Sequence, residues 1–362
     1  MKSRSMSRLC VLLTAAFLFF QPGIAANARE SGAFPAITPG DAARKYAGLP
    51  AVQTDSWETL AEIALWASGS DAATSAQSMS LLKMDIADLA ASPDLPENTR
   101  ERGEYVLTFI HTRYLKQYSW SQTRLDEILL YGRYNCVSSA VLYMLMAASI
   151  GLDVQGVATK DHAFATVRTD TGSIDVETTN RYGFDPGNRK EFHDDFGAST
   201  GFAYVPARHY RDRIQLNRLE LVSLILSNRI AELERGRNYA AAVPLAVDRA
   251  ALLEGKSTAA ASFFPDPKKD LTDRLLNYGA TLLRDGQEED AFSWAILVNV
   301  KYPDPARWEE FNYAALHNLV VKLLRKSDVS AAEAAYERLS SRVSPKNAEK
   351  VKILISETLK RQ

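Results

Sequence analysis

The chain has 362 residues, of which 46% are hydrophobic and 24% are charged, with 43 basic residues against 44 acidic ones. This balance leaves no basic surplus, which argues against nucleic acid or an anionic membrane surface as the main partner. A chain of this length is expected to form two or three domains.

The first 28 residues have the pattern of a secretory signal peptide. Basic residues precede an apolar run from Val11 to Phe20, which is too short to span a bilayer as a helix. Cleavage is expected after Ala28, with Ala25 as the alternative site and an uncleaved anchor as the competing interpretation. Cleavage after Ala28 removes three basic residues and no acid, so the net charge falls from −1 to about −4. The sequence predicts a secreted or periplasmic protein with no stable membrane span after cleavage.

The cysteine content supports a use for one thiol. Only Cys10 and Cys136 are present, and signal cleavage removes the first. The exported chain therefore keeps one thiol and cannot form an internal disulfide. In an oxidising compartment that thiol is subject to oxidation. We expect Cys136 to be either buried or functional.

Three segments are expected after the signal peptide. Residues 29–98 are predicted to form an arm and helices, because a helical pattern over 55–92 is followed by prolines. Residues 99–212 form the predicted core, which starts with an amphipathic helix from Asn98 to Tyr118. Residues 213–362 are predicted to be helical throughout.

The core is expected to place helices before strands. A short helix is predicted from Leu125 to Tyr131, and a second begins after Asn135, a residue type that caps helix N-termini. Its apolar residues recur at the spacing of one buried stripe, namely Val137, Ala140, Val141, Met144, Leu145 and Ala148. Two or three strands follow, over 154–159, 162–168 and 173–179. This order favours an α+β fold over an alternating α/β fold.

The C-terminal segment contains three similar stretches, which begin at Ala231, Thr281 and Lys322. Each is followed by an alanine-bearing helix, and the spacings are 50 and 41 residues. The pattern resembles degenerate tetratricopeptide-type helical hairpins, whose usual repeat is about 34 residues. An irregular helical bundle is the alternative, and either could bind a protein partner.

The core carries the residue types of a thiol nucleophile with its base and orienting acid. Cys136 lies in the first turn of its helix, where free N–H groups and the helix dipole favour a thiolate and can bind an oxyanion. His162 opens a strand, and the next strand carries Asp175 and Glu177 on one face. Free cysteine is often simply a core residue, and acids on a strand are often a solvated face.

Strand register decides whether this triad can form. His162 shares a face with Asp175 or Glu177 only if it pairs with an odd-numbered residue. That condition requires an even number of loop residues, such as Asp170 and Thr171 alone. An odd loop would put the acids on the opposite face of the sheet.

These residues resemble the core of the transglutaminase-like superfamily, which belongs with the papain-like thiol enzymes. The resemblance covers residues 100–200 and rests on four stretches of sequence: Asn135–Ala140, Ala147–Val154, Asp161–Phe164 and Val176–Thr179. It implies Cys136 as the nucleophile, His162 as the base, and Glu177 at the place of the family's aspartate. Asp175 stands two residues earlier and stays an alternative acid.

The predicted function is thiol-dependent hydrolysis of an amide or peptide, through an acyl-enzyme on Cys136. Transfer to an amine is the variant reaction, and a non-catalytic protein- or peptide-binding module is the alternative. No cofactor is expected, because no phosphate-binding loop or dinucleotide fingerprint is visible. No metal site is expected either, since one cysteine and scattered histidines lack metal-ligand spacing.

Overall fold

The computed structural model describes residues 34–187, 191–192, 212–259, 264 and 266–360. The predicted signal peptide, residues 1–28, lies outside the described residues. Within the described residues, no helix has both the length and the apolar character needed to cross a membrane.

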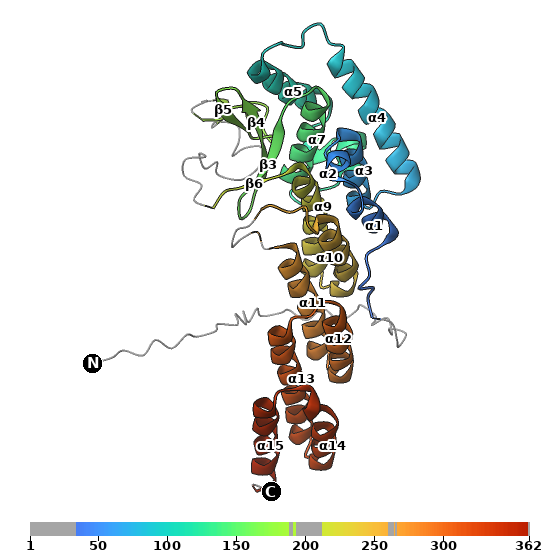
Figure 1. Ribbon diagram of the computed structural model, residues 1–362, viewed down its shortest axis with the longest axis vertical. Coiled ribbons are helices and arrows are strands. Elements are labelled where there is room, and N and C mark those ends of the chain that lie inside the picture. Colours follow the sequence, from blue (N-terminus) through green and yellow to red (C-terminus); the bar gives the residue numbers. More distant parts are fainter. Residues whose placement is uncertain (1–33, 188–190, 193–211, 260–263, 265, 361–362) are drawn as a thin grey trace, which may run out of the picture. The chain divides into compact units, whose positions relative to one another are not determined.

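The N-terminal part is helical (Figure 1). Its helices are α1 (Asp41–Ala47), α2 (Ala51–Thr54), α3 (Trp57–Ser68), α4 (Ala72–Ala90) and α5 (Thr99–Arg113). The helical pattern over 55–92 contains two helices because Gly69, with a φ of 74°, ends α3 and the Asp71 side chain caps α4. Asn98 caps α5 by accepting from two backbone N–H groups.

The helix expected to reach Tyr118 ends earlier, at Arg113. Residues 117 and 118 instead form β1 (Gln117–Tyr118), which pairs in parallel with β2 (Arg133–Tyr134). The carbonyl of Gly132 accepts from the backbone N–H groups of Lys116 and Gln117. The prediction was wrong here because helical spacing does not reveal a short pairing with a segment that comes later in the chain.

A small antiparallel sheet has the order β5-β4-β3-β6. Its strands are β3 (Val154–Ala158), β4 (Ala163–Thr169), β5 (Gly172–Val176) and β6 (Ile214–Leu216). The first three correspond to the predicted strands. The last was missed, because it lies where only helix was expected. A mostly helical chain with this sheet is compatible with the predicted α+β class.

Helix α7 (Cys136–Ser149) packs against β3 and β4 on one side and against α3, α5 and α9 on others. Eleven of its 14 residues are buried, including Leu142 and Met146, which lie off the predicted stripe. The prediction of one buried stripe was therefore too narrow. Cover on several sides explains why the polar groups of Ser139 and Tyr143 are also buried and hydrogen-bonded.

The C-terminal part consists of helical hairpins. These are α9 (Arg218–Arg235) with α10 (Tyr239–Leu253), α11 (Pro267–Arg284) with α12 (Glu288–Lys301), and α13 (Pro305–Arg325) with α14 (Val329–Leu339), followed by η2 (Ser340–Arg342) and α15 (Pro345–Leu359). Each hairpin turns through one residue of positive φ, at Arg237, Gly286 and Ser327. The turns coincide with the ends of the three similar stretches found in the sequence. Their tetratricopeptide-type character stays a prediction.

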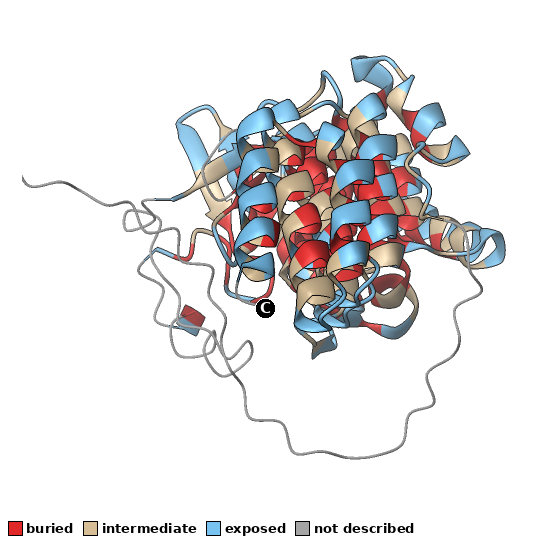
Figure 2. Ribbon diagram, turned by 90° about the horizontal axis from the view of Figure 1, so that it is seen from below, coloured by how far each residue is buried: buried red, intermediate tan, exposed pale blue. Residues whose placement is uncertain are grey.

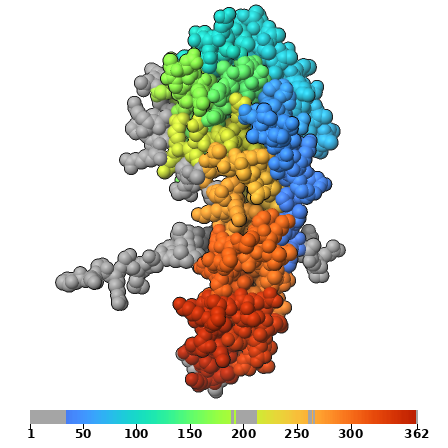
Figure 3. Space-filling model, viewed as in Figure 1, coloured from blue at the N-terminus to red at the C-terminus, as the bar shows by residue number. Residues whose placement is uncertain are grey.

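Buried residues gather on the sides of the helices that face one another (Figure 2). One hydrophobic cluster contains Leu60, Val141 and Ile225, so it joins side chains from all three segments expected after the signal peptide. Helices α1 and α3 contact α10 and α9, which places blue surface beside yellow and orange in Figure 3. The first helix of the C-terminal part is therefore packed into the same core as α7.

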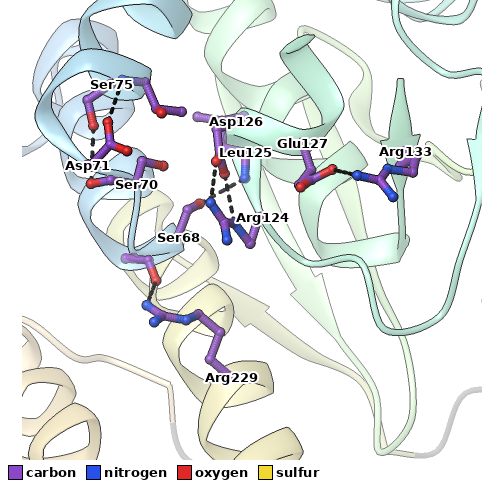
Figure 4. A network of polar contacts seen from close by, with 12 residues as sticks. Ser68, Ser70, Asp71, Ser75, Arg124, Leu125, Asp126, Glu127, Arg133 and Arg229 are labelled. Carbon is purple, nitrogen blue, oxygen red and sulfur yellow. Dashed lines mark hydrogen bonds and ion pairs between the residues drawn. The ribbon is translucent and has the colours of Figure 1, made fainter. Parts of the chain in front are cut away.

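Polar contacts also attach α6 (Leu125–Tyr131) and α9 to the end of α3 (Figure 4). The Ser68 hydroxyl accepts from the Leu125 N–H at 2.8 Å, and Arg229 of α9 donates to the Ala67 carbonyl at 2.5 Å. These contacts hold both α6 and α9 against the end of α3.

Candidate active site

Cys136 is the first residue of α7, and its neighbours hold that helix end in place. The Asn135 side chain accepts from the N–H groups of Val137 and Ser138, each at 3.0 Å, and the Ser138 hydroxyl accepts from the Asn135 N–H. This capping box leaves the Cys136 N–H with no described partner. The helix dipole and this free donor favour negative charge beside the sulfur.

His162 and Glu177 lie just beyond the ends of β4 and β5. The hairpin loop is Asp170 and Thr171 alone, and Thr166 pairs with Asp175. The register condition for a shared face is therefore met. The His162 Nε2 atom lies 2.6 Å from the Glu177 Oε2 atom. The Cys136 thiol lines the same cavity as His162 and contributes by hydrogen bonding to the raised pKa of that ring, so the structure brings Cys136, His162 and Glu177 together.

The carboxylate of Glu177 is held at both oxygens. Oε1 accepts from the Thr179 hydroxyl at 2.6 Å and from the Thr179 N–H at 3.2 Å, while Oε2 faces His162. Only 3% of the Glu177 side chain is exposed, against 16% for His162. Because both oxygens are engaged, the orientation of the carboxylate toward the ring is fixed.

The surroundings of His162 favour its charged form. Burial alone would lower the pKa of the ring, but the Glu177 charge and hydrogen bonds to Cys136 and Glu177 together raise the pKa of His162 well above its ordinary value. The imidazolium form therefore persists at pH values where a free histidine is neutral. Such a ring can accompany a thiolate and can donate a proton to a leaving amine.

The other candidate acid, Asp175, pairs with an arginine and not with His162. Its two carboxylate oxygens accept from the two terminal nitrogens of Arg213, at 2.6 and 2.7 Å. That guanidinium also lies over the Phe164 ring, 5.3 Å from its centre. Asp175 shares the sheet face of His162 but is engaged in a bidentate ion pair, so the acid bonded to the imidazole is Glu177.

A cavity of about 190 Å³ opens over Cys136 and His162. It is lined by Tyr118, Trp120, Ser121, Asn135, Cys136, Asp161, His162, Asn228, Ala231, Glu232 and Arg235. The last four belong to α9, which starts about 80 residues after Cys136 in the sequence. The sequence did not predict that α9 lines the cavity, because the spacing of its residues carries no information about contacts with Cys136.

The remaining candidates for a functional site are a metal site and the other histidines. Within the described residues, no three or more His, Cys, Asp or Glu side chains are arranged so that they could hold a metal ion. The His111 Nε2 atom lies 3.1 Å from the Thr178 carbonyl, which supports the segment that carries Glu177. His193 and His209 lie outside the described residues, and His317 lies in α13 beside Tyr313.

A close backbone approach at Gly183 gives a first prediction. A Cβ atom at this position would lie 1.9 Å from the Glu177 carbonyl oxygen. We expect Gly183→Ala to displace the Glu177 segment and to cost about 1–3 kcal/mol of unfolding free energy. Urea unfolding measures this loss, with Gly187→Ala as the matched control, since its Cβ would meet only ordinary contacts at 3.8 Å. Equal stability of the two variants would contradict the prediction.

No protein-family model matches the sequence, and no curated protein matches it significantly.

Proposed function

We propose that the protein is an exported thiol hydrolase of amides or peptides, with a transglutaminase-like core and tetratricopeptide-like C-terminal hairpins. The observation that carries the proposal is the grouping of Cys136 at a helix N-terminus, His162 on the same cavity, and Glu177 at 2.6 Å from the His162 ring. Nucleophile, base and orienting acid in this order are the parts that covalent acyl transfer requires.

In the first half of the reaction, the thiol proton passes to His162 and the sulfur attacks the amide carbonyl carbon. Glu177 bonds Nε2, which leaves Nδ1 of the ring for the thiol. The Cys136 N–H is placed to donate to the oxyanion of the tetrahedral intermediate. Collapse of the intermediate breaks the carbon–nitrogen bond. His162 gives its proton to the departing amine, and a thioester remains on the sulfur.

In the second half, the same groups remove the acyl chain. His162, now neutral, accepts a proton from water, and the resulting hydroxide attacks the thioester carbon. Collapse then releases a carboxylic acid and restores the thiolate beside the imidazolium. A primary amine in place of water gives a new amide, which is the transfer variant of the same chemistry. Hydrolysis is the simpler proposal, because water needs no acceptor site.

Reaction with an activated ester tests this function without knowledge of the natural substrate. We expect p-nitrophenyl acetate to release a burst of nitrophenolate equal to the protein concentration, followed by slower turnover, because the acyl-enzyme forms faster than water removes it. Mass spectrometry should locate the acetyl group on Cys136, and Cys136→Ser should abolish the burst. A protein that gives no acyl adduct on Cys136 is the binding module of the alternative interpretation, with intact helical hairpins but no acyl chemistry.

A further inference from the structure

The mouth of the cavity over Cys136 carries an exposed aromatic ring and an exposed arginine in contact. Trp120 is 60% exposed, although it adjoins the buried end of α7. The guanidinium of Arg235, on α9, lies over the Trp120 ring at 4.6 Å from its centre. Both residues line the same cavity as Cys136 and His162.

Stacking orders the arginine while leaving its hydrogen-bond donors available. A guanidinium that lies over an aromatic face keeps its N–H groups at the edges of its own plane, where they can bind a carboxylate bidentately. Among the described residues, the contact of the Arg235 guanidinium is with the Trp120 ring and not with a carboxylate, whereas Arg229, also on α9, donates a hydrogen bond to the Ala67 carbonyl. Arg235 is therefore a positive group that the Trp120 ring holds at the cavity and that pairs with no carboxylate among the described residues.

The other charges of the cavity restrict what this arginine can take. Asp161 and Glu232 also line the cavity, so Arg235 and the imidazolium of His162 face two acids. A ligand with one carboxylate beside Arg235 gains from the guanidinium, while a ligand with several negative charges meets the two acids. The cavity volume of about 190 Å³ leaves room for a group no larger than one side chain.

We infer that Trp120 and Arg235 form a carboxylate clamp, so that the preferred substrate is an amide with one carboxylate close to the scissile bond. An acidic side chain or the C-terminal carboxylate of a peptide both supply this group. The inference rests on the proposed function, because an amide is a substrate here only if Cys136 carries out acyl transfer. The clamp itself is a binding property that can be measured even if no acyl transfer occurs.

Two reagents of equal size test the clamp, because iodoacetate carries a carboxylate and iodoacetamide does not. In a Cys10→Ser chain, Cys136 is the only thiol. We expect Arg235→Gln to slow alkylation by iodoacetate about three- to tenfold, while iodoacetamide changes by less than about twofold. Glu232→Gln should raise the ratio of the iodoacetate rate to the iodoacetamide rate, since it removes an opposing charge.

The matched control is Arg284→Gln, which removes the same charge from an arginine that also lies over an aromatic ring, that of Tyr239, but does not line the cavity. An unchanged rate ratio in Arg235→Gln overturns the clamp, and so does an equal fall in Arg284→Gln. A ratio that falls only in Arg235→Gln supports it. Acidic and neutral forms of one peptide, added as competitors of alkylation, then separate a side-chain carboxylate from a C-terminal one.

Failure of the clamp and failure of the proposed function give different results. The function fails if Cys136 forms no acyl adduct, whatever the rate ratio. The clamp fails if the ratio ignores Arg235, even where the acyl adduct forms.

Discussion

Replacing His162 with alanine is expected to slow the alkylation of Cys136 at about pH 5 to 6 by on the order of a hundredfold or more. A free thiol has a pKa of about 8.5 and supplies little thiolate at such pH values. In the parent protein, burial opposes the charged ring, but Glu177 and the bond to Cys136 raise the pKa of His162 well above its ordinary value. The imidazolium is therefore present beside Cys136 below neutral pH, and alanine supplies no positive charge there.

The measurement is the pH dependence of iodoacetamide alkylation in the Cys10→Ser chain, where every adduct reports Cys136. His317→Ala is the matched control, because that ring lies in α13 beside Tyr313 and outside the cavity. An alkylation profile that rises only near pH 8.5, and is the same with and without His162, would show that no activated pair exists in the resting protein.

The arrangement of Cys136 and His162 shows which features of the site local sequence patterns can predict. Alternation along β4 and β5 set the condition for a shared face of His162, Asp175 and Glu177, namely an even number of loop residues, and the two-residue loop of the structure meets that condition. The position of Cys136 follows from the cap at Asn135. These features depend on residues within a few positions of one another, where periodicity and capping act.

The alternation of side chains along the strand could not show which of the two acids bonds His162. Asp175 and Glu177 lie on the same strand face, and the choice depends on Arg213, which occupies Asp175, and on Thr179, which holds Glu177. Arg213 belongs to a segment far along the chain, beside a strand that only the sheet reveals. Its partner is thus fixed by tertiary packing rather than by local pattern.

The residues that α9 contributes to the cavity could not be predicted from the sequence for the same reason. Helix α9 reads as one amphipathic helix, with Asn217 as its cap and Glu220 completing the capping box. Nothing in that pattern says which of its exposed residues faces Cys136. Packing against α3 and α7, and the bond from Arg229 to the end of α3, decide that Arg235 and Glu232 meet the cavity.

Replacing Glu177 with glutamine is expected to lower the rate of acylation at Cys136 by on the order of 10²- to 10⁴-fold while leaving the fold intact. The reason lies in the second oxygen of the carboxylate. Oε1 accepts two hydrogen bonds from Thr179, so the glutamine carbonyl is drawn to the same donors and its NH₂ group turns toward His162. The ring must then accept at Nε2, which puts the proton on Nδ1. In that tautomer the ring cannot take the thiol proton.

The same substitution should change how stability depends on pH. The folded pKa of His162 is raised, so its contribution to stability is fully present below the ordinary histidine pKa of about 6.5 and is lost as the pH rises through the folded value. In Glu177→Gln the opposing effect of burial dominates, and this loss of stability with rising pH should disappear. Urea unfolding across that range measures the change.

Asp175→Asn is the control that separates the two acids. It removes a carboxylate from the same strand face, but one that is paired with Arg213 rather than with the imidazole. We expect it to leave both the ester burst and the pH dependence of stability close to those of the parent. If Asp175→Asn abolished the burst and Glu177→Gln did not, the orienting acid would be Asp175, and the mechanism built on the bond between Glu177 and His162 would be wrong.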